Sequence, residues 1–171
     1  MEFYEVIRTR RSIRSYKADP VPEESLRRVL DAARMAPSGS NRQPWRFIVV
    51  KSPEKKRRVA QACGGQMWID QAPIVIAAAG WKVPTNRGGY IGEKSFVMDL
   101  SIAFTQLILA ARAEGLGTCW IGDFQNTEMK KILGLPDDLD VVAVTPLGYP
   151  DRDGFTEETS RKPLEEVVEE A

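Results

Sequence analysis

Residues 97–113 read VMDLSIAFTQLILAARA, and this stretch decides the fold. Twelve of its seventeen residues are apolar. On a helix with about 100° between successive residues, Asp99 and Gln106 fall on one side. The polar residues Ser101, Thr105 and Arg112 fall nearly opposite. A helix predicted over residues 93–114 therefore has two separate apolar faces, one with Leu100, Phe104, Leu107 and Ala111 and the other with Ile102, Leu109 and Ala113.

This helix has more apolar surface than a single chain needs to bury. A helix at the surface of a monomer requires only one apolar stripe. One interpretation is a central helix that its own domain encloses. The other is a helix buried between two subunits, which we favour because 171 residues offer limited wrapping. The sequence therefore predicts a homodimer with a large apolar interface.

The remaining elements alternate irregularly around this helix. A helix opens at Pro22 and ends before Pro37, since the residue that precedes a proline disfavours the helical conformation. Strands are expected at 45–50, 73–79, 118–121 and 141–147, with helices at 53–63 and from a cap at Thr127 to Gly134 and a short helical patch at 164–168. No glycine-rich phosphate loop follows the strands at 45–50 or 73–79, which argues against a doubly wound nucleotide fold. The class is therefore α/β or α+β.

The composition excludes several mechanisms. The chain has 24 basic and 24 acidic residues and no histidine. A Ser-His-Asp or Cys-His triad, a histidine-liganded zinc and an imidazole general base are therefore impossible. Chemistry must come from carboxylates, amines, a thiol or a bound cofactor, and no metal site is predicted. The length fits one domain, residues 1–171.

The net charge of zero hides a gradient along the chain. Residues 1–60 carry 15 basic and 7 acidic side chains, whereas residues 61–171 carry 9 and 17. Two interpretations are open: a solvated basic face, or an anionic ligand held by the N-terminal segment.

The sequence favours a cytoplasmic location. The first residues are acidic and lack the apolar region of a signal peptide. Asp99, Gln106 and Arg112 interrupt the apolar stretches, so no membrane partner is expected. Cys63 and Cys119 have no CxxC neighbour and are expected to be free, buried thiols.

Three motifs carry the chemistry, and the first is Arg10-Arg11-Ser12-Ile13-Arg14. In an extended segment alternate residues point the same way, so Arg10, Ser12 and Arg14 could converge on one ligand. Two guanidinium groups and a hydroxyl suit a phosphate. As an isolated signal, the motif also fits a solvated or RNA-contacting run.

The second motif is the loop 37–45, PSGSNRQPW. A helix stop and turn would need only one glycine and one proline. Here two hydroxyls and two carboxamides lie within six residues, and each carboxamide offers donors and an acceptor. Such a set can match a heterocycle edge that alternates C=O, N–H and N. The third motif, Arg161-Lys162, is a basic pair in an acidic tail, where local charge balance is the simpler interpretation.

Taken in order, these motifs resemble those of the nitroreductase family of FMN-dependent oxidoreductases. Further matches are the long apolar helix leading into GLGTCWIG at 115–122, GYP at 148–150 and RKPLE at 161–165. The resemblance covers essentially the whole chain. It implies an α+β fold with a mixed central sheet surrounded by helices, in an intertwined homodimer whose partner is wrapped by the tail, about 151–171.

The resemblance also implies which residues bind the cofactor. The FMN phosphate and ribityl chain would be held by Arg10, Arg11, Ser12 and Arg14, with Arg161 closing over the phosphate and Lys162 assisting. The loop residues would lie at the flavin ring and ribityl chain, reaching into the partner's site: Pro37, Ser38, Gly39, Ser40, Asn41 and Gln43. Ile121 and Gly122 would face the ring with their backbone N–H groups.

The implied activity is a ping-pong reduction of nitroaromatics, quinones or a similar small acceptor by NAD(P)H through the flavin. No catalytic side chain is then required, because the cofactor carries the chemistry. Alternatives are an FMN enzyme of a related type, for dehalogenation or flavin fragmentation, and a non-catalytic flavin or electron-transfer protein. A nucleic-acid-binding module would leave Asn41, Gln43 and the acidic half unexplained.

One segment departs from the family pattern. Residues 81–93 are brief where longer members carry an insertion, so a specific substrate pocket is in doubt. Trp81, Tyr90 and Phe124 are candidates for pocket lining, although packing is the commoner role for such residues.

Overall fold

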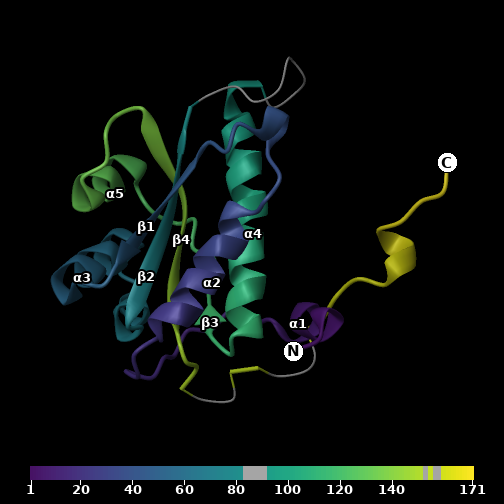
Figure 1. Ribbon diagram of the computed structural model, residues 1–171, viewed down its shortest axis with the longest axis horizontal. Coiled ribbons are helices and arrows are strands. Elements are labelled where there is room, and N and C mark those ends of the chain that lie inside the picture. The colour runs from purple at the N-terminus through teal and green to yellow at the C-terminus, as the bar shows by residue number, and fades with distance from the viewer. Residues whose placement is uncertain (83–91, 152–153, 156–158) are drawn as a thin grey trace.

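A four-stranded sheet lies between two layers of helices in the computed structural model (Figure 1), which describes residues 1–82, 92–151, 154–155 and 159–171. The strands are β1 (Trp45–Val50), β2 (Ile74–Trp81), β3 (Gly117–Thr118) and β4 (Leu139–Gly148). Their order in the sheet is β1-β2-β4-β3. All three neighbouring pairs are antiparallel, and a parallel pairing is added by the isolated bridge between Ser12 and Thr118. This arrangement confirms the α+β class.

The apolar composition of β2 explains its central place. Seven consecutive residues, IVIAAAG, are buried, so the strand must be covered on both faces. The helices α2 (Glu23–Arg34) and α4 (Ser95–Ala113) pack on one face. The helices α3 (Pro53–Ala62) and α5 (Asn126–Leu133) cover the other, together with the short helix η2 (Met67–Gln71). Figure 1 shows the sheet edge-on between these two groups.

The two apolar faces predicted for α4 differ in their surroundings. Leu100, Phe104, Leu107 and Ala111 are fully buried against the sheet. On the other face Ile102 is 39% exposed, and Met98 beside it is 42% exposed. By length and composition α4 could cross a membrane, yet half of it is buried inside the fold, as in a core helix. The single chain therefore covers one face of α4 and leaves the other open.

The structure adds the α-helix α1 (Phe3–Thr9) and short 3-10 helices such as η2 to the expected elements, and it reduces the strand expected at 118–121 to β3. The first turn of α1 is capped by the Glu2 carboxylate. The helix α5 begins at Asn126 rather than after a cap at Thr127. The reason is that the Asn126 side chain pairs with the backbone of Val141 in β4, donating at 2.9 Å and accepting at 3.3 Å.

The C-terminal residues 159–171 are exposed and carry the short helix η4 (Leu164–Glu166). Figure 1 shows this tail leaving the body beside α1 and extending away from it. Its apolar side chains Leu164, Val167 and Val168 are 68%, 63% and 56% exposed. The tail therefore has apolar groups that its own chain does not cover.

Candidate functional site

The basic segment after α1 lies against β3. Ile13 donates its N–H to the Thr118 carbonyl at 2.8 Å, and Ser12 forms the parallel bridge with Thr118. Ile13 is buried, whereas Ser12 and Arg14 are exposed and Arg10 is half-buried. Ser12 and Arg14 are thus exposed on either side of the buried Ile13, whereas Arg10 and Arg11 are both half-buried. The convergence of Arg10, Ser12 and Arg14 on one ligand stays a prediction.

A glycine allows this close approach. A Cβ atom at Gly117 would lie 2.8 Å from Cγ1 of Ile13, inside van der Waals contact. Because Ile13 is itself packed against Tyr16 and Ala72, it has little room to move. Gly117 therefore sets the distance between the basic segment and the sheet.

Like charges gather around Arg10. Burial lowers the pKa of Arg10, and the nearby guanidinium groups of Arg161 and Arg11 lower it further. The Arg14 guanidinium lies 6.0 Å from the centre of the Trp68 ring. Guanidinium groups that lie close together destabilise one another's charge, and a bound anion would offset this repulsion.

Cys119 lies inside this group. It is 4% exposed, and burial raises the pKa of its thiol, while Arg14, a hydrogen bond from Ser12 and Arg10 act in the opposite direction. Its backbone N–H donates to the Thr145 hydroxyl at 3.0 Å. The buried thiol of Cys119 therefore lies beneath Arg10, Ser12 and Arg14.

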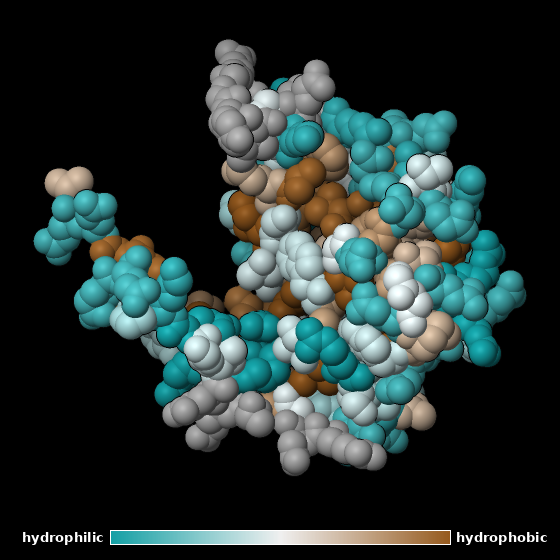
Figure 2. Space-filling model, turned by 180° about the vertical axis from the view of Figure 1, so that it is seen from behind, coloured by the Kyte–Doolittle hydropathy of each residue, from teal (hydrophilic) through white to brown (hydrophobic). Residues whose placement is uncertain are grey.

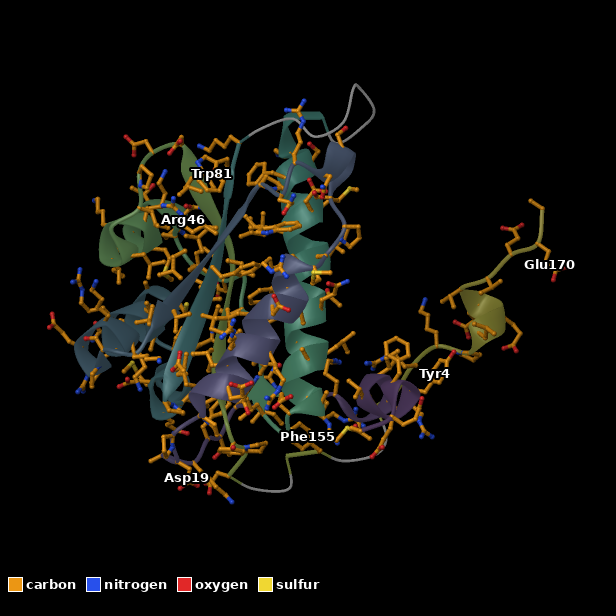
Figure 3. The ribbon with its side chains drawn as sticks, viewed as in Figure 1. Tyr4, Asp19, Arg46, Trp81, Phe155 and Glu170 are labelled. Atoms are coloured by element: carbon orange, nitrogen blue, oxygen red, sulfur yellow. The ribbon has the colours of Figure 1, made fainter. Side chains whose placement is uncertain are left out.

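Arg11 and Arg112 form hydrogen bonds with the C-terminal end of α1, which leads into the basic segment. Nη1 of Arg11 donates to the carbonyls of Arg8 and Arg10 at the C-terminal end of α1, both at 2.8 Å. Nε of Arg112, near the end of α4, donates to the Thr9 hydroxyl at 2.9 Å. The Arg112 guanidinium also lies 3.9 Å from the centre of the Phe155 ring, and Figure 3 shows Phe155 at that end of α4. Arg11 thus faces α1.

The tail pair is exposed. Arg161 donates to the carbonyl of Ser160 at 2.8 Å, and its charge is the largest electrostatic influence on Arg10. Lys162 is exposed beside it. The structure therefore brings Arg161 near the basic segment from the far end of the sequence.

The second motif forms a strained loop. Ser40, Asn41 and Gln43 have φ angles of 53°, 54° and 50°, a left-handed conformation that is uncommon for residues with a Cβ atom. The loop bonds to itself, with the N–H of Gln43 on the Ser38 hydroxyl at 2.9 Å and the N–H of Asn41 on the Ser38 carbonyl at 2.9 Å. Ser40, Asn41 and Gln43 are exposed, as is Pro37, while Ser38 and Gly39 are half-buried. Such strain in an exposed polar loop is typical of functional segments.

Ile121 and Gly122, the two residues predicted to face the flavin ring, differ in their surroundings. The N–H and the carbonyl of Ile121 both pair with Val144, at 2.9 Å and 3.0 Å, and Ile121 is 4% exposed. Gly122 is exposed, and a Cβ atom at its position would lie 3.9 Å from Nε1 of Trp120, an ordinary van der Waals contact. The backbone group that this turn offers to a ligand is therefore at Gly122.

These groups do not meet within one chain. The loop is bound to α4 at Asp99, and the basic segment is bound to it at Arg112. Thirteen residues (112 − 99) separate the two contacts, or about 20 Å along a helix axis. Figure 1 likewise shows the loop near one end of α4 and α1 near the other. The chain thus carries two partial sites, one at each end of α4.

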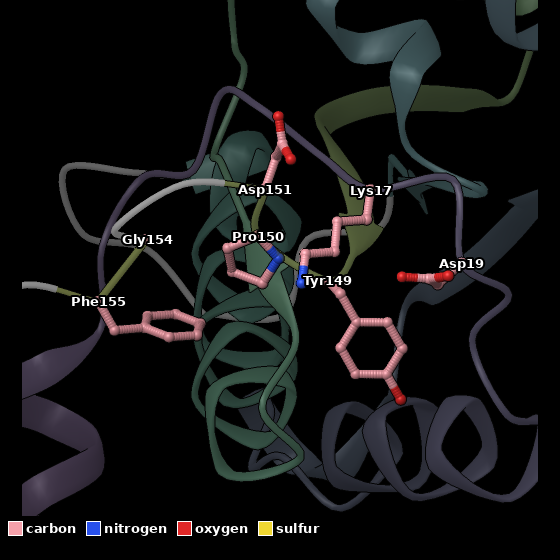
Figure 4. A pocket seen from close by; sticks show the side chains of 7 residues that line it. All are labelled: Lys17, Asp19, Tyr149, Pro150, Asp151, Gly154 and Phe155. Carbon is pink, nitrogen blue, oxygen red and sulfur yellow. The ribbon is translucent and has the colours of Figure 1, made fainter.

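A cavity of about 510 Å³ lies beside the basic segment but does not share its charge. Figure 4 shows Phe155 on one side of it and Lys17, Tyr149 and Asp19 on the other. Its lining offers one ammonium and the two carboxylates of Asp19 and Asp151. It therefore lacks the excess of cations that a phosphate requires.

The candidates for pocket lining are engaged in packing. The Trp81 ring carries the Arg46 guanidinium 5.1 Å from its centre, and Figure 3 shows the two together at one end of the sheet. Phe124 packs into the core that α3 and α5 cover. Tyr90 and most of the brief segment 81–93 lie outside the described residues.

Sequence reasoning missed the roles of Asp99 and Cys119. Asp99 accepts a hydrogen bond from the N–H of Gly39, and Cys119 touches the basic group. For Asp99 the signal was available, because a carboxylate within a largely apolar helix needs a partner. For Cys119 the contact arises only from the pairing of β3 with a segment more than 100 residues earlier.

The sequence profile of the Nitroreductase family matches residues 7–87 and 66–149. A protein of Thermus thermophilus described as NADH dehydrogenase is 35% identical over 93% of this chain and 91% of its own length. The crystal structure of a nitroreductase family protein from Clostridium novyi superposes with a TM-score of 0.82 and 37% identity, over 89% of this chain and 87% of that one. The chain belongs to the nitroreductase family, a family of oxidoreductases.

Other relatives are named for other reactions. Iodotyrosine deiodinase 1 of Mus musculus is 29% identical over 98% of this chain and 68% of its own length. The 5,6-dimethylbenzimidazole synthase of Rhodobacter capsulatus is 32% identical over 91% of this chain and 85% of its own. Membership of the family thus fixes the fold and the class of enzyme, and leaves the particular reaction open.

The contact between Gly117 and Ile13 leads to a prediction about stability. Gly117→Ala should lower the free energy of unfolding by about 1–3 kcal/mol, because the added methyl group overpacks a closed contact. The measurement is urea unfolding of the purified chain at one protein concentration. In an Ile13→Ala background the same change should cost clearly less, since two of the opposing carbon atoms are gone. Equal costs in both backgrounds would contradict the assignment.

Proposed function

We propose that this protein is a cytoplasmic, homodimeric FMN-dependent oxidoreductase that uses NAD(P)H to reduce a small acceptor such as a nitroaromatic or a quinone. The observation that carries the proposal is the group of guanidiniums around Arg10, whose pKa is lowered by burial and by Arg161. Arginine remains cationic under all relevant conditions, so this repulsion persists until an anion binds. A phosphate monoester such as that of FMN would supply that anion.

The residues present fit FMN in three places. Arg10, Ser12 and Arg14 lie on one segment, and Arg161 lies near Arg10, so four groups could bind the phosphate, with Lys162 close by. The loop residues 37–43 offer the carboxamides of Asn41 and Gln43 in a conformation fixed by left-handed backbone angles. Gly122 is exposed and has no side chain of its own, so its backbone N–H could approach a ligand.

Bound FMN would supply hydride and electron transfer, which explains how a chain without histidine performs redox chemistry. The protein's own contributions are then binding and electrostatics. Cationic groups at the phosphate hold the cofactor in place, and the N–H of Gly122 would stabilise negative charge on an atom near it. Bound FMN would have one exposed face, so NAD(P)H and the acceptor would react at that face in turn. This succession is the basis for a ping-pong scheme.

The separation of the two partial sites supports the proposed homodimer. A two-fold axis that crosses α4 near its middle would set the N-terminal end of one α4 beside the C-terminal end of the other. The loop of one copy would then reach the basic segment of its partner. The exposed face of α4, with Met98 and Ile102, supplies apolar surface for this contact, and Figure 2 shows apolar side chains gathered on the side of the body that faces the tail. The exposed Leu164, Val167 and Val168 would let the tail, about 151–171, wrap the partner.

The first prediction from this proposal concerns FMN affinity. Arg14→Ala should weaken FMN binding by roughly ten- to a hundredfold, because a charge-assisted hydrogen bond is worth about 1.5–3 kcal/mol. The measurement is titration of the apoprotein with FMN, followed by quenching of flavin fluorescence. Arg57→Ala, an exposed arginine on α3, is the matched control and should bind like wild type. Unchanged affinity of the Arg14 variant would remove this residue from the phosphate site.

The second prediction separates an enzyme from a flavin carrier. When the FMN-loaded protein is mixed anaerobically with NADH or NADPH, the yellow colour of the oxidised flavin should bleach rapidly, and a nitroaromatic or quinone should restore it. A protein that takes up FMN but stays yellow with both nicotinamides would be a carrier. A protein that takes up no FMN would contradict the proposal as a whole.

The third prediction tests the shared site. Arg14→Ala alters the basic segment and Asn41→Ala alters the loop, so each homodimer should bind FMN weakly at both sites. In a heterodimer of the two variants, one site carries both defects and the other carries neither. Co-expression with two affinity tags should therefore give a dimer that binds one FMN with wild-type affinity. If the heterodimer has no tight site, the loop and the basic segment do not serve the same flavin across the interface.

A further inference from the structure

Asp99 is a buried carboxylate in a largely apolar helix. It is 5% exposed, and its neighbours Leu100 and Ala103 are fully buried. Burying an ionised carboxylate is costly unless its oxygens are hydrogen-bonded. A leucine at this position would pack without that cost, so the carboxylate must do something that packing alone does not.

The two oxygens of Asp99 are used unequally. Oδ1 accepts a hydrogen bond from the N–H of Gly39 at 3.1 Å. Oδ2 is buried and has no hydrogen-bond partner among the described residues. The hydrogen bond from Gly39 is therefore the contribution of the Asp99 carboxylate to the fold.

Gly39 lies at the front of the strained loop. Three left-handed residues follow within four positions, at Ser40, Asn41 and Gln43. A residue with a Cβ atom is strained in such a conformation, which persists only where its surroundings determine it. The hydrogen bonds of the Ser38 side chain and carbonyl tie the loop to itself.

The loop is fixed to the body at its two ends. The Asp99 contact joins its front to α4, and the N–H of Trp81 on the Pro44 carbonyl, at 3.1 Å, joins its end to β2. The exposed residues Asn41 and Gln43 stand between these two anchors. Without the first anchor, the strain of the loop can relax by moving its front.

We propose that Asp99 is a positioning residue: its carboxylate holds the loop 38–43 in the left-handed conformation that presents Asn41 and Gln43 to the cofactor. The effect on FMN rests on the proposed function, whereas the hold on the loop does not. Asp99 acts through Gly39, so it changes affinity without belonging to the ligand shell.

Two substitutions separate this role from simple packing. Asp99→Leu has a similar shape, removes the buried charge and lacks an acceptor, so it should fold with a thermal midpoint no lower than that of wild type. Asp99→Asn keeps one oxygen for the N–H of Gly39 and replaces the other by an amide group. The control is Gln106→Ala, a half-buried residue about two turns further along the same side of α4.

The first readout is hydrogen exchange of the Gly39 amide in the FMN-free dimer, followed in peptides that cover residues 37–44. The second is the Kd for FMN. In the leucine variant the Gly39 amide should exchange faster, and the Kd should rise about tenfold for the loss of one buried hydrogen bond. The asparagine variant should restore slow exchange and bring the Kd within about threefold of wild type, because its amide oxygen still accepts the hydrogen bond from Gly39.

The outcomes divide cleanly. If the leucine variant keeps both slow exchange and wild-type affinity, Asp99 does not hold the loop. If exchange accelerates while the Kd is unchanged, the hold is real but Asp99 does not position the loop for FMN, and the proposal is overturned. If the wild-type protein itself binds no FMN, the proposed function fails, and the exchange of Gly39 still decides whether Asp99 holds the loop.

Discussion

The packing of α4 against the sheet fixes where the other functional parts lie. Leu100, Phe104 and Leu107 are fully buried, and each such side chain contributes about 1.5–3 kcal/mol relative to an exposed position. These contacts hold α4 in one position on the sheet, with a defined face directed outward. One end carries Asp99 and with it the polar loop; the other carries Arg112, which holds both α1 and the start of the tail. A change in how α4 sits on the sheet would move both partial sites together.

Both partial sites carry an unfavourable feature that the rest of the fold must offset. At one end, burial and the positive charges of Arg161 and Arg11 lower the pKa of Arg10. At the other, three residues with a Cβ atom adopt left-handed backbone angles. Local conflicts of this kind concentrate at functional sites, because a ligand relieves them. Charge crowding at one end and polar, preorganised amides at the other also match the two ends of a nucleotide-like ligand, a phosphate and a heterocycle.

Much of this fold could be predicted because local signals and tertiary packing agree. The strand at 45–50 and the helix that starts at Pro53 behave as their apolar pattern and capping residues indicate. The α1 helix was missed because its residues Phe3, Tyr4 and Ile7 stay exposed, so the segment has no apolar stripe that its own chain buries. The start of α5 was misplaced because Asn126 serves a strand far along the chain. The distance between the two motifs of the site depends on the length and placement of α4, which no local pattern near either motif contains.

The two cysteines bear on how the reaction can proceed. Burial, with the charge of Asp123, raises the pKa of Cys63 to about 12, and burial raises that of Cys119. Both thiols are therefore protonated at neutral pH and are poor nucleophiles, although Cys119 lies within the basic group. The chain has no histidine, and the side chains around Arg10 offer cations and a hydroxyl group rather than an imidazole or a reactive thiolate. Relatives named for a dehydrogenase, a deiodinase and a synthase match most of this chain, so the fold is compatible with more than one reaction.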